Sequence, residues 1–297
     1  MKLPLVNKSF KKNISRLLSI LILLKSSFSA FAYDWPQANP LFSSFFGQFR
    51  GSTISSSLIF SETSEIKACE QGKAILYIRE YQDDTDFFPS TLGNALIISH
   101  SDNLVTIYGN LEKDSTSEEI LSKPVIEKGE VIATSGDSSW HEGQSALELL
   151  VVDTKSNVSI NPRLLMPRNV KEEQLYISGV LLQNRNGTYY DITKQNYLPA
   201  GSYRVYRKRQ ALAVPYKSRV SINGALSDEI SYDVLRQDGN LLCVSGKRNY
   251  PRSVLYPNEN LHLTGEVTFA PGKNLLQIAL SDFSGKEVQQ SFTINNY

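Results

Sequence analysis

Few residues of this chain could ligate a metal ion or act as a nucleophile. The 297 residues include three histidines, His100, His141 and His262, and two cysteines, Cys69 and Cys243. A catalytic zinc site takes three protein ligands and keeps one position open for water, so three dispersed histidines make such a site hard to assemble. Neither cysteine has a histidine close by in sequence, and no Gly-x-Ser-x-Gly sequence occurs. The composition therefore disfavours metal and nucleophilic catalysis, and we expect no cofactor.

The same residues have simpler roles in a folded domain. We expect His100 to be structural, His141 to lie in a solvated loop or to contact a partner, and His262 to face solvent from a strand. Cys69 and Cys243 fall in different predicted domains. A disulfide between the domains is compatible with an exported protein, but two buried free thiols is the favoured interpretation.

The first 32 residues have the pattern of a secretory signal. Basic residues without an acid occupy the first sixteen positions, an apolar run spans residues 17–24, and Ala30 and Ala32 form a small-x-small cleavage site. The apolar run is far shorter than the roughly 20 residues that cross a bilayer as a helix. We therefore assign residues 1–32 to a signal peptide and expect an exported protein, periplasmic or at the cell surface, with no transmembrane span in the mature chain. Lys25 weakens the pattern and leaves an uncleaved anchor as an alternative.

The net charge disfavours one class of partner. Residues 1–32 hold six of the 31 Lys and Arg and none of the 30 Asp and Glu, so the mature chain has 25 basic and 30 acidic residues. A nucleic-acid-binding protein shows the opposite balance, and we expect no nucleic acid as a partner. The length of the mature chain is sufficient for two domains that each bury a core.

The mature chain has the pattern of an all-β protein. After an aromatic and proline-rich lead at residues 33–44, short β-branched or alternating runs recur between Gly, Asp, Asn and Ser clusters, which is typical of a sandwich or barrel. Residues 115–121 predict a short helix with Ser117 as its cap. The strand runs of the first half are residues 66–77, 95–99, 104–108, 131–135 and 147–152.

A charged, aperiodic break at residues 168–174 predicts a domain boundary near residue 172. Beyond it, turns are predicted at Asp238-Gly239, Pro271-Gly272 and Ser284-Gly285. About seven strands over some 120 residues are typical of an immunoglobulin-like sandwich, which we assign to residues 173–297. The strand runs here are residues 175–182, 202–206, 219–222, 229–235, 261–269, 275–280 and 288–294.

The order of motifs in the first half resembles the lysostaphin/LytM-type peptidoglycan zinc endopeptidases. That family shows in succession a dG.V turn, a G..V.I.H strand, a T.Y.HL strand, a V..G..I...G hairpin, an HLHFEI strand and a closing NP. The resemblance covers about residues 45–167 and implies a LytM-type (duplicated hybrid motif) β-sandwich, which we assign to residues 45–172. The matching segments are GKAILY (72–77), GNALIISH (93–100), TIYGNL (106–111), VIEKGEVIA (125–133), GQSALELLV (143–151) and NP (161–162).

The resemblance also implies where the zinc ligands and the catalytic histidines would stand. The family takes its ligands from a His-x-x-x-Asp pair and from the second His of His-x-His. Matching ISSSLIF (54–60) to FHSGIDI places Ser55 and Ile59 at the first two ligand positions. The apolar alternation at residues 147, 149 and 151 marks the core face, so Glu148 takes the third ligand position. The two catalytic positions fall on Asn110 and Ala146.

These replacements predict a degenerate, non-catalytic member of the family. One carboxylate does not make a zinc site, so we expect a pseudopeptidase that binds or scaffolds peptidoglycan or an envelope protein, and by family analogy could regulate cell-wall hydrolases. The expected binding groove is formed by Asn110, Trp140, His141 and Glu148. Two alternatives remain: an active peptidoglycan metalloendopeptidase with a relocated metal site, and a structural or adhesive surface protein.

Overall fold

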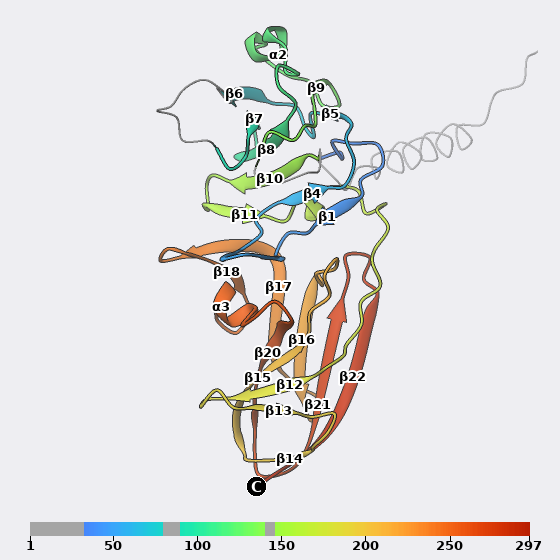
Figure 1. The fold of residues 1–297 in the computed structure, drawn as a ribbon, viewed down its shortest axis with the longest axis vertical. Helices are drawn as coiled ribbons and strands as arrows, with labels where there is room; N and C mark the ends of the chain where they lie inside the picture. Colours follow the sequence, from blue (N-terminus) through green and yellow to red (C-terminus); the bar gives the residue numbers. More distant parts are fainter. Residues whose placement is uncertain (1–32, 80–89, 140–145) are drawn as a thin grey trace, which may run out of the picture.

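The computed structural model describes residues 33–79, 90–139 and 146–297, and the predicted signal peptide lies outside them. Nearly every element in these ranges is a β-strand, which confirms the all-β fold class (Figure 1). None of the described helices is long and apolar enough to cross a membrane. The elements up to residue 164 are β1 (Phe42–Ser44), β2 (Phe49–Arg50), β3 (Thr53–Ile54), β4 (Leu58–Phe60), β5 (Glu65–Lys67), β6 (Lys73–Ile78), β7 (Asn94–Ser99), β8 (Leu104–Leu111), α2 (Glu118–Ser122), β9 (Val131–Thr134), β10 (Glu148–Asp153), β11 (Val158–Ile160) and the 3-10 helix η1 (Pro162–Leu164).

The second half of the chain continues with strands and one helical turn. Residues 165–180 contain no strand, and the first strand after them begins at Leu181. The elements are β12 (Leu181–Asn184), β13 (Tyr189–Asp191), β14 (Tyr197–Leu198), β15 (Gly201–Lys208), β16 (Lys217–Ile222), β17 (Ala225–Asp238), β18 (Leu241–Ser245), β19 (Asn249–Pro251), α3 (Arg252–Leu255), β20 (Leu261–Phe269), β21 (Gly272–Ser281) and β22 (Glu287–Asn296).

The first half is organised around β10. β8 pairs with one side of β10, while β4 pairs with its start and β11 with its end on the other side. The sheet continues from β8 through β7 to β6, and all these pairings are antiparallel. Leu147, Leu149 and Val151 are fully buried in the core, because alternate residues of a strand point to the same face.

The second half is a sandwich of two sheets. One sheet has the order β13-β12-β15-β20, and the other runs β14-β22-β21-β16-β17, with β18 paired to β17 and β19 paired to β18 (Figure 1). Side chains from both sheets form the apolar core between them, including Leu182 of β12, Val205 of β15, Leu276 of β21 and Ile294 of β22. The immunoglobulin-like assignment of this sandwich stays a prediction.

One sheet and one core run through both halves. β11 pairs antiparallel with β17, with Ile160 opposite Val234. Asn161 donates from its backbone N to the carbonyl of Asp233 at 2.8 Å and from Nδ2 to the carbonyl of Tyr232 at 3.0 Å. The larger apolar core likewise contains residues from both halves. The boundary predicted near residue 172 therefore separates segments that share a sheet and a core.

The hairpin of β2 and β3 joins the two halves a second time. These short strands pair only with each other among the described strands. The hydroxyl of Tyr256 donates to the carbonyl of Gly47 at 2.7 Å, and Nε of Arg252 donates to the carbonyl of Gly51 at 3.1 Å. The second half thus holds this hairpin in place, and the hairpin positions Arg50 beside Glu148 at the start of β10.

Candidate functional site

The first residue of β10, Glu148, lies at the centre of the positions that the family resemblance singles out. It stands opposite Ile59 of β4 on one side and opposite Gly109 of β8 on the other. Ser57, in the segment before β4, donates a hydrogen bond to Glu148. Ala146, two residues before Glu148, accepts a hydrogen bond from Asn110 at the end of β8. The structure therefore brings together all five positions assigned to zinc and catalysis: Ser55, Ile59, Asn110, Ala146 and Glu148.

Glu148 is a buried carboxylate held by a guanidinium and a hydroxyl. Its side chain is 3% exposed, whereas that of Arg50 is 37% exposed. Nη1 of Arg50 lies 2.6 Å from Oε1, Nη2 lies 3.4 Å from Oε2, and the hydroxyl of Ser57 donates to Oε1 at 2.6 Å. An uncompensated buried carboxylate is strongly unfavourable. Arg50 and Ser57 therefore stabilise the charged form of Glu148 inside the protein.

The first two ligand positions have become part of the framework. Oγ of Ser55 donates to the carbonyl of Ser57 at 3.2 Å, and the backbone N of Ser55 donates to the carbonyl of Gln48 at 2.8 Å. Ser55 thereby closes the β2–β3 hairpin onto the start of β4. Ile59 is nearly buried and lies on the same face as Glu148, because directly paired residues of a sheet point to the same side. Neither side chain offers an imidazole or a carboxylate.

Asn110 has a structural role where the family has a catalytic histidine. It is fully buried and has a φ of 60°, in the left-handed region that Asn adopts more readily than most residues. Nδ2 donates to the carbonyl of Ala146 at 2.6 Å, and Oδ1 accepts from the backbone N of Ser139 at 2.8 Å. The side chain of Asn110 therefore joins the end of β8 to the segments on either side of residues 140–145.

The expected binding groove is described only in part. Trp140 and His141 lie outside the described residues. The other two members, Asn110 and Glu148, are buried, and their polar atoms bind protein groups. The groove therefore stays a prediction.

The donor set around Glu148 does not fit a zinc ion. A zinc site needs at least three nitrogen, sulfur or carboxylate ligands that converge at about 2.0 to 2.3 Å. Of the three ligand positions, only Glu148 carries such a group, and both of its oxygens already face Arg50. Among residues 33–79, 90–139 and 146–297, no three His, Cys, Asp or Glu side chains are grouped so that they could hold a metal ion.

The remaining described candidates in the first half are structural, and both thiols are buried. Nδ1 of His100 lies 2.8 Å from the carbonyl of Gln71, and Nε2 lies 2.8 Å from Oγ1 of Thr106. Cys69 and Cys243 are buried and free, as the favoured interpretation predicts. Burial raises the pKa of the Cys69 thiol to about 12, so this residue is not a reactive thiolate.

The prediction that His262 faces solvent is wrong. Its side chain is buried, with Nδ1 3.3 Å from Nη2 of Arg207, Nε2 2.5 Å from the hydroxyl of Tyr232, and the ring stacked on Tyr256. Burial, followed by the charges of Arg207 and Arg209, holds the pKa of His262 well below its ordinary value. The physical reason is that residues 262–265 of β20 are buried in succession, so both faces of the strand are covered here.

Sequence reasoning missed Arg50 and Ser57. Arg50 precedes Glu148 by 98 positions, and no periodic pattern links residues that far apart. One signal was available, because a glutamate inside an apolar strand requires a cation or strong donors nearby. That requirement predicts a partner for Glu148 without saying which residue supplies it.

Comparisons with solved structures find similar but distant proteins. Lysostaphin from Staphylococcus simulans, described as an antimicrobial peptidase, is 13% identical with a TM-score of 0.36, over 88% of this chain and 91% of that chain. LytU is 17% identical with a TM-score of 0.34, over 43% of this chain and 85% of that chain. Likenesses of this strength say nothing about activity.

Sequence comparisons give a closer relative. A protein-family model matches residues 174–297. An uncharacterised protein of Treponema pallidum (strain Nichols) is 30% identical over 117 residues, which are 37% of this chain and 79% of that protein. The chain belongs to the same family as this Treponema pallidum protein.

Proposed function

We propose that the chain is an exported, non-catalytic, peptidase-like protein that binds peptidoglycan or another protein of the cell envelope. Export rests on the signal pattern of residues 1–32, and the envelope ligand rests on the motif order of residues 45–167. A role in regulating cell-wall hydrolases is part of the proposal by family analogy alone.

The observation that carries this proposal is the ion pair between Arg50 and Glu148. In an active member of the resembled family, a metal ion would supply positive charge at this strand position and activate a water molecule. Here the guanidinium of Arg50 supplies the charge, and Ser57 binds the same carboxylate oxygen at 2.6 Å. A guanidinium neutralises a carboxylate and donates hydrogen bonds, but it does not generate a hydroxide nucleophile.

The proposal is tested by incubating the purified protein with isolated peptidoglycan. We expect the protein to sediment with the polymer, to release no soluble fragments detectable by mass spectrometry, and to contain no stoichiometric zinc by elemental analysis. Release of fragments that a chelator abolishes would support an active enzyme with a relocated metal site. Absence of both sedimentation and fragment release would favour a structural or adhesive surface protein.

Restoring the ligands tests the assignment of the positions themselves. The variant Arg50→Gln with Ser55→His, Ile59→Asp and Glu148→His should bind about one zinc ion per chain, because these positions meet around β10. The matched control keeps Arg50 and carries the other three changes. We expect this control to bind zinc at least about tenfold more weakly, because a fixed cation repels the metal. Failure of both variants to bind zinc would show that the register is wrong.

A further inference from the structure

A groove of about 560 Å³ lies in the second half of the chain, away from the predicted groove around β10. Its floor is the outer face of the four-stranded sheet, where Gln183 of β12 stands opposite Arg204 of β15, and Arg204 stands opposite Glu266 of β20. One pair further along, Ser202 stands opposite Thr268. The intervening residues Tyr203, Val205 and Val267 point into the sandwich core, so the strand period places the polar side chains outside.

One wall of the groove is the turn between β18 and β19, which carries Lys247 and Arg248. A buried carboxylate, Asp228, fixes this turn beside β20. Its Oδ1 accepts from the backbone N of Lys247 at 2.7 Å, and its Oδ2 accepts from the backbone N of Glu266 at 2.9 Å and from the hydroxyl of Tyr250 at 2.5 Å. The position of the basic turn is therefore built into the fold.

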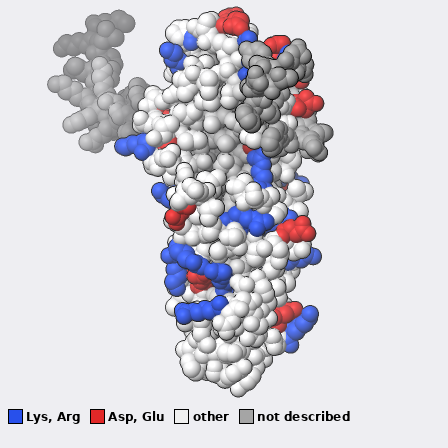
Figure 2. Space-filling view, turned by 60° about the vertical axis from the view of Figure 1, so that its left-hand side comes forward, with Lys and Arg blue, Asp and Glu red and all other residues white. Residues whose placement is uncertain are grey.

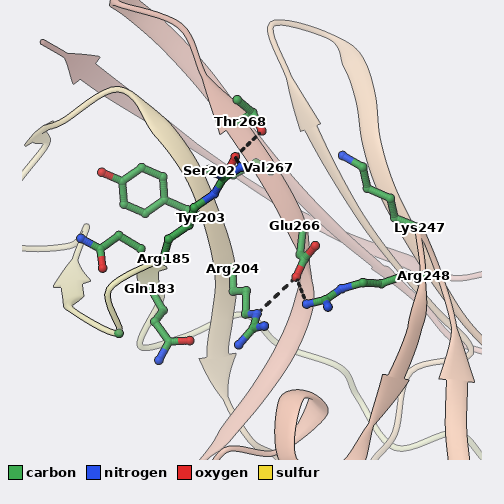
Figure 3. A pocket seen from close by; sticks show the side chains of 12 residues that line it. Gln183, Arg185, Ser202, Tyr203, Arg204, Lys247, Arg248, Glu266, Val267 and Thr268 are labelled. Atoms are coloured by element: carbon green, nitrogen blue, oxygen red, sulfur yellow. Dashed lines mark hydrogen bonds and ion pairs between the residues drawn. The ribbon is translucent and has the colours of Figure 1, made fainter.

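The groove carries an excess of positive charge. Its lining contains Arg185, Arg204, Lys247 and Arg248 against the single carboxylate of Glu266. Oε1 of Glu266 accepts from Nε of Arg204 at 3.2 Å and also from Arg248, so one carboxylate holds two guanidinium groups (Figure 3). Figure 2 shows several Lys and Arg side chains close together on the lower half of the molecule. This concentration contrasts with the near balance of charge over the whole chain, which has 31 Lys and Arg against 30 Asp and Glu.

The arrangement suits a compact anion with several oxygens. Guanidinium groups bind phosphate and carboxylate in a two-pronged geometry, and a lysine adds a mobile point charge. The lining offers hydroxyl donors, Ser202 and Thr268, which lie 3.1 Å apart. It offers no aromatic platform for a sugar or a base, because Tyr203 is buried and its hydroxyl donates to the carbonyl of Pro199 at 2.7 Å. Recognition here depends on charge and hydrogen bonds.

We propose that this groove binds a phosphate-bearing ligand, either a small phosphorylated molecule or the phosphate of a lipid headgroup. A phosphate monoester carries about −1.5 to −2 charge near neutral pH and presents three acceptor oxygens, which matches an excess of cations over a single carboxylate. A carboxylate ligand presents fewer oxygens and less charge at one point. The volume of the groove lies in the range of small-molecule sites, about 300 to 1,000 Å³.

The test compares two variants that remove the same charge from the same half of the chain. Arg185→Gln with Lys247→Gln alters the groove without touching the Glu266 ion pairs. The matched control, Arg236→Gln with Lys273→Gln, removes two cations outside the groove lining. Binding is measured by calorimetry with pyrophosphate and with glutarate, and by flotation with vesicles of phosphatidylglycerol or of phosphatidylcholine.

We expect saturable binding of pyrophosphate that weakens at least tenfold in the groove variant, stays within twofold in the control, and falls as salt rises to about 0.3 M. Binding to phosphatidylglycerol vesicles alone, with the same dependence on the groove, would identify the lipid headgroup as the source of the phosphate. The proposal is overturned if neither phosphate probe binds, if glutarate binds more tightly than pyrophosphate, or if both variants lose binding equally.

Discussion

At the scale of single residues, Glu148 shows how a polar position is kept inside a core. A carboxylate that is nearly removed from water remains charged only if donors replace its hydration. Arg50 and Ser57 provide such donors, and the partly exposed guanidinium keeps some solvation of its own. Removing one partner should therefore cost more than breaking a surface ion pair and less than breaking a fully buried one.

Replacing Arg50 tests this balance. We expect Arg50→Met to lower the free energy of unfolding by about 2 kcal/mol, because Glu148 loses its guanidinium partner. Arg219→Met is the control, since both side chains of the Arg219–Glu287 pair are partly exposed. We expect this substitution to lower the free energy of unfolding by less than about 1 kcal/mol. Adding Glu148→Gln to Arg50→Met should recover part of the loss. Equal costs for Arg50→Met and Arg219→Met in urea unfolding would contradict this account.

A second residue-scale prediction concerns acid stability. The pKa of His262 is held well below its ordinary value of 6.5 by burial and then by Arg207 and Arg209, with Tyr232 and Tyr256 as its other neighbours. The unfolded chain therefore binds a proton near pH 6.5 that the folded chain does not, and stability falls as pH drops below this value. When the pH falls from 7.5 to 5.5, we expect this group to lower the free energy of unfolding by about 1.4 kcal/mol.

The measurement is urea unfolding at both pH values for the wild-type protein and for His262→Gln. The variant should be less stable overall, since it loses the contacts of the ring, but its pH dependence should be shallower by about 1.4 kcal/mol. An unchanged difference between the two pH values in the variant would show that other groups control the acid response.

The residue-scale predictions from sequence succeed where a local pattern carries the information. Ser117 caps α2 as predicted, and its hydroxyl accepts from the backbone N of Ile120 at 3.3 Å. The partner of Glu148 and the burial of His262 could not be predicted, because both depend on contacts between segments far apart in the chain. Local periodicity does not indicate which distant segment packs over a strand.

At the scale of elements, the β2–β3 hairpin connects the second half to the site at β10. It is held by Tyr256 and Arg252, and it carries Arg50, which binds Glu148. Gly47 and Gly51 flank the hairpin strand β2, and both have positive φ, 81° and 56°. A Cβ at Gly47 would lie 2.4 Å from Cδ1 of Tyr232, whereas no atom lies within 4 Å of a Cβ at Gly51. The two glycines therefore share a backbone requirement and differ in packing.

This difference gives a matched pair of substitutions. We expect Gly51→Ala to cost about 1 kcal/mol, the penalty of a left-handed alanine. Gly47→Ala should cost about 2 to 4 kcal/mol, because it also pushes the hairpin away from Tyr232. Chemical denaturation measures both. If the two variants have the same stability, the close packing of the hairpin on the second half is not important.

The longer strands were largely predictable. Alternating runs at 95–99, 104–108 and 261–269 correspond to β7, β8 and β20, and the predicted turn at Asp238-Gly239 separates β17 from β18. The run at 175–182 becomes a strand only from Leu181. The shorter strands, among them β18 and β19, were not predicted, since β18 pairs with β17 and β19 with β18, and these pairings are set by the tertiary fold.

At the scale of the whole molecule, the sequence predicts two β units, and in the structure the two segments share one sheet and one core. The charged break at 168–174 is a real change in pattern, and residues 165–180 contain no strand. What the pattern could not show is that β11 pairs with β17, because sheet pairing between distant strands leaves no local trace. A change in composition along the chain marks a connecting segment, and it does not show whether the segments on either side pack against each other.

The shared sheet and core predict that the two halves unfold together. Separating them would expose the edge of β17 together with buried residues of the common core such as Tyr232 and Leu235, and an exposed apolar edge strand is unfavourable in water. We therefore expect the full chain to show one calorimetric transition, with equal van't Hoff and calorimetric enthalpies. We expect a fragment of residues 173–297 to melt at a lower temperature than the full chain or to aggregate. Protease should cut first within 168–174, where the described backbone has no strand, and the nicked chain should remain associated. Two separate transitions, one of them reproduced by the fragment at the same temperature, would instead establish two independent folding units that only touch.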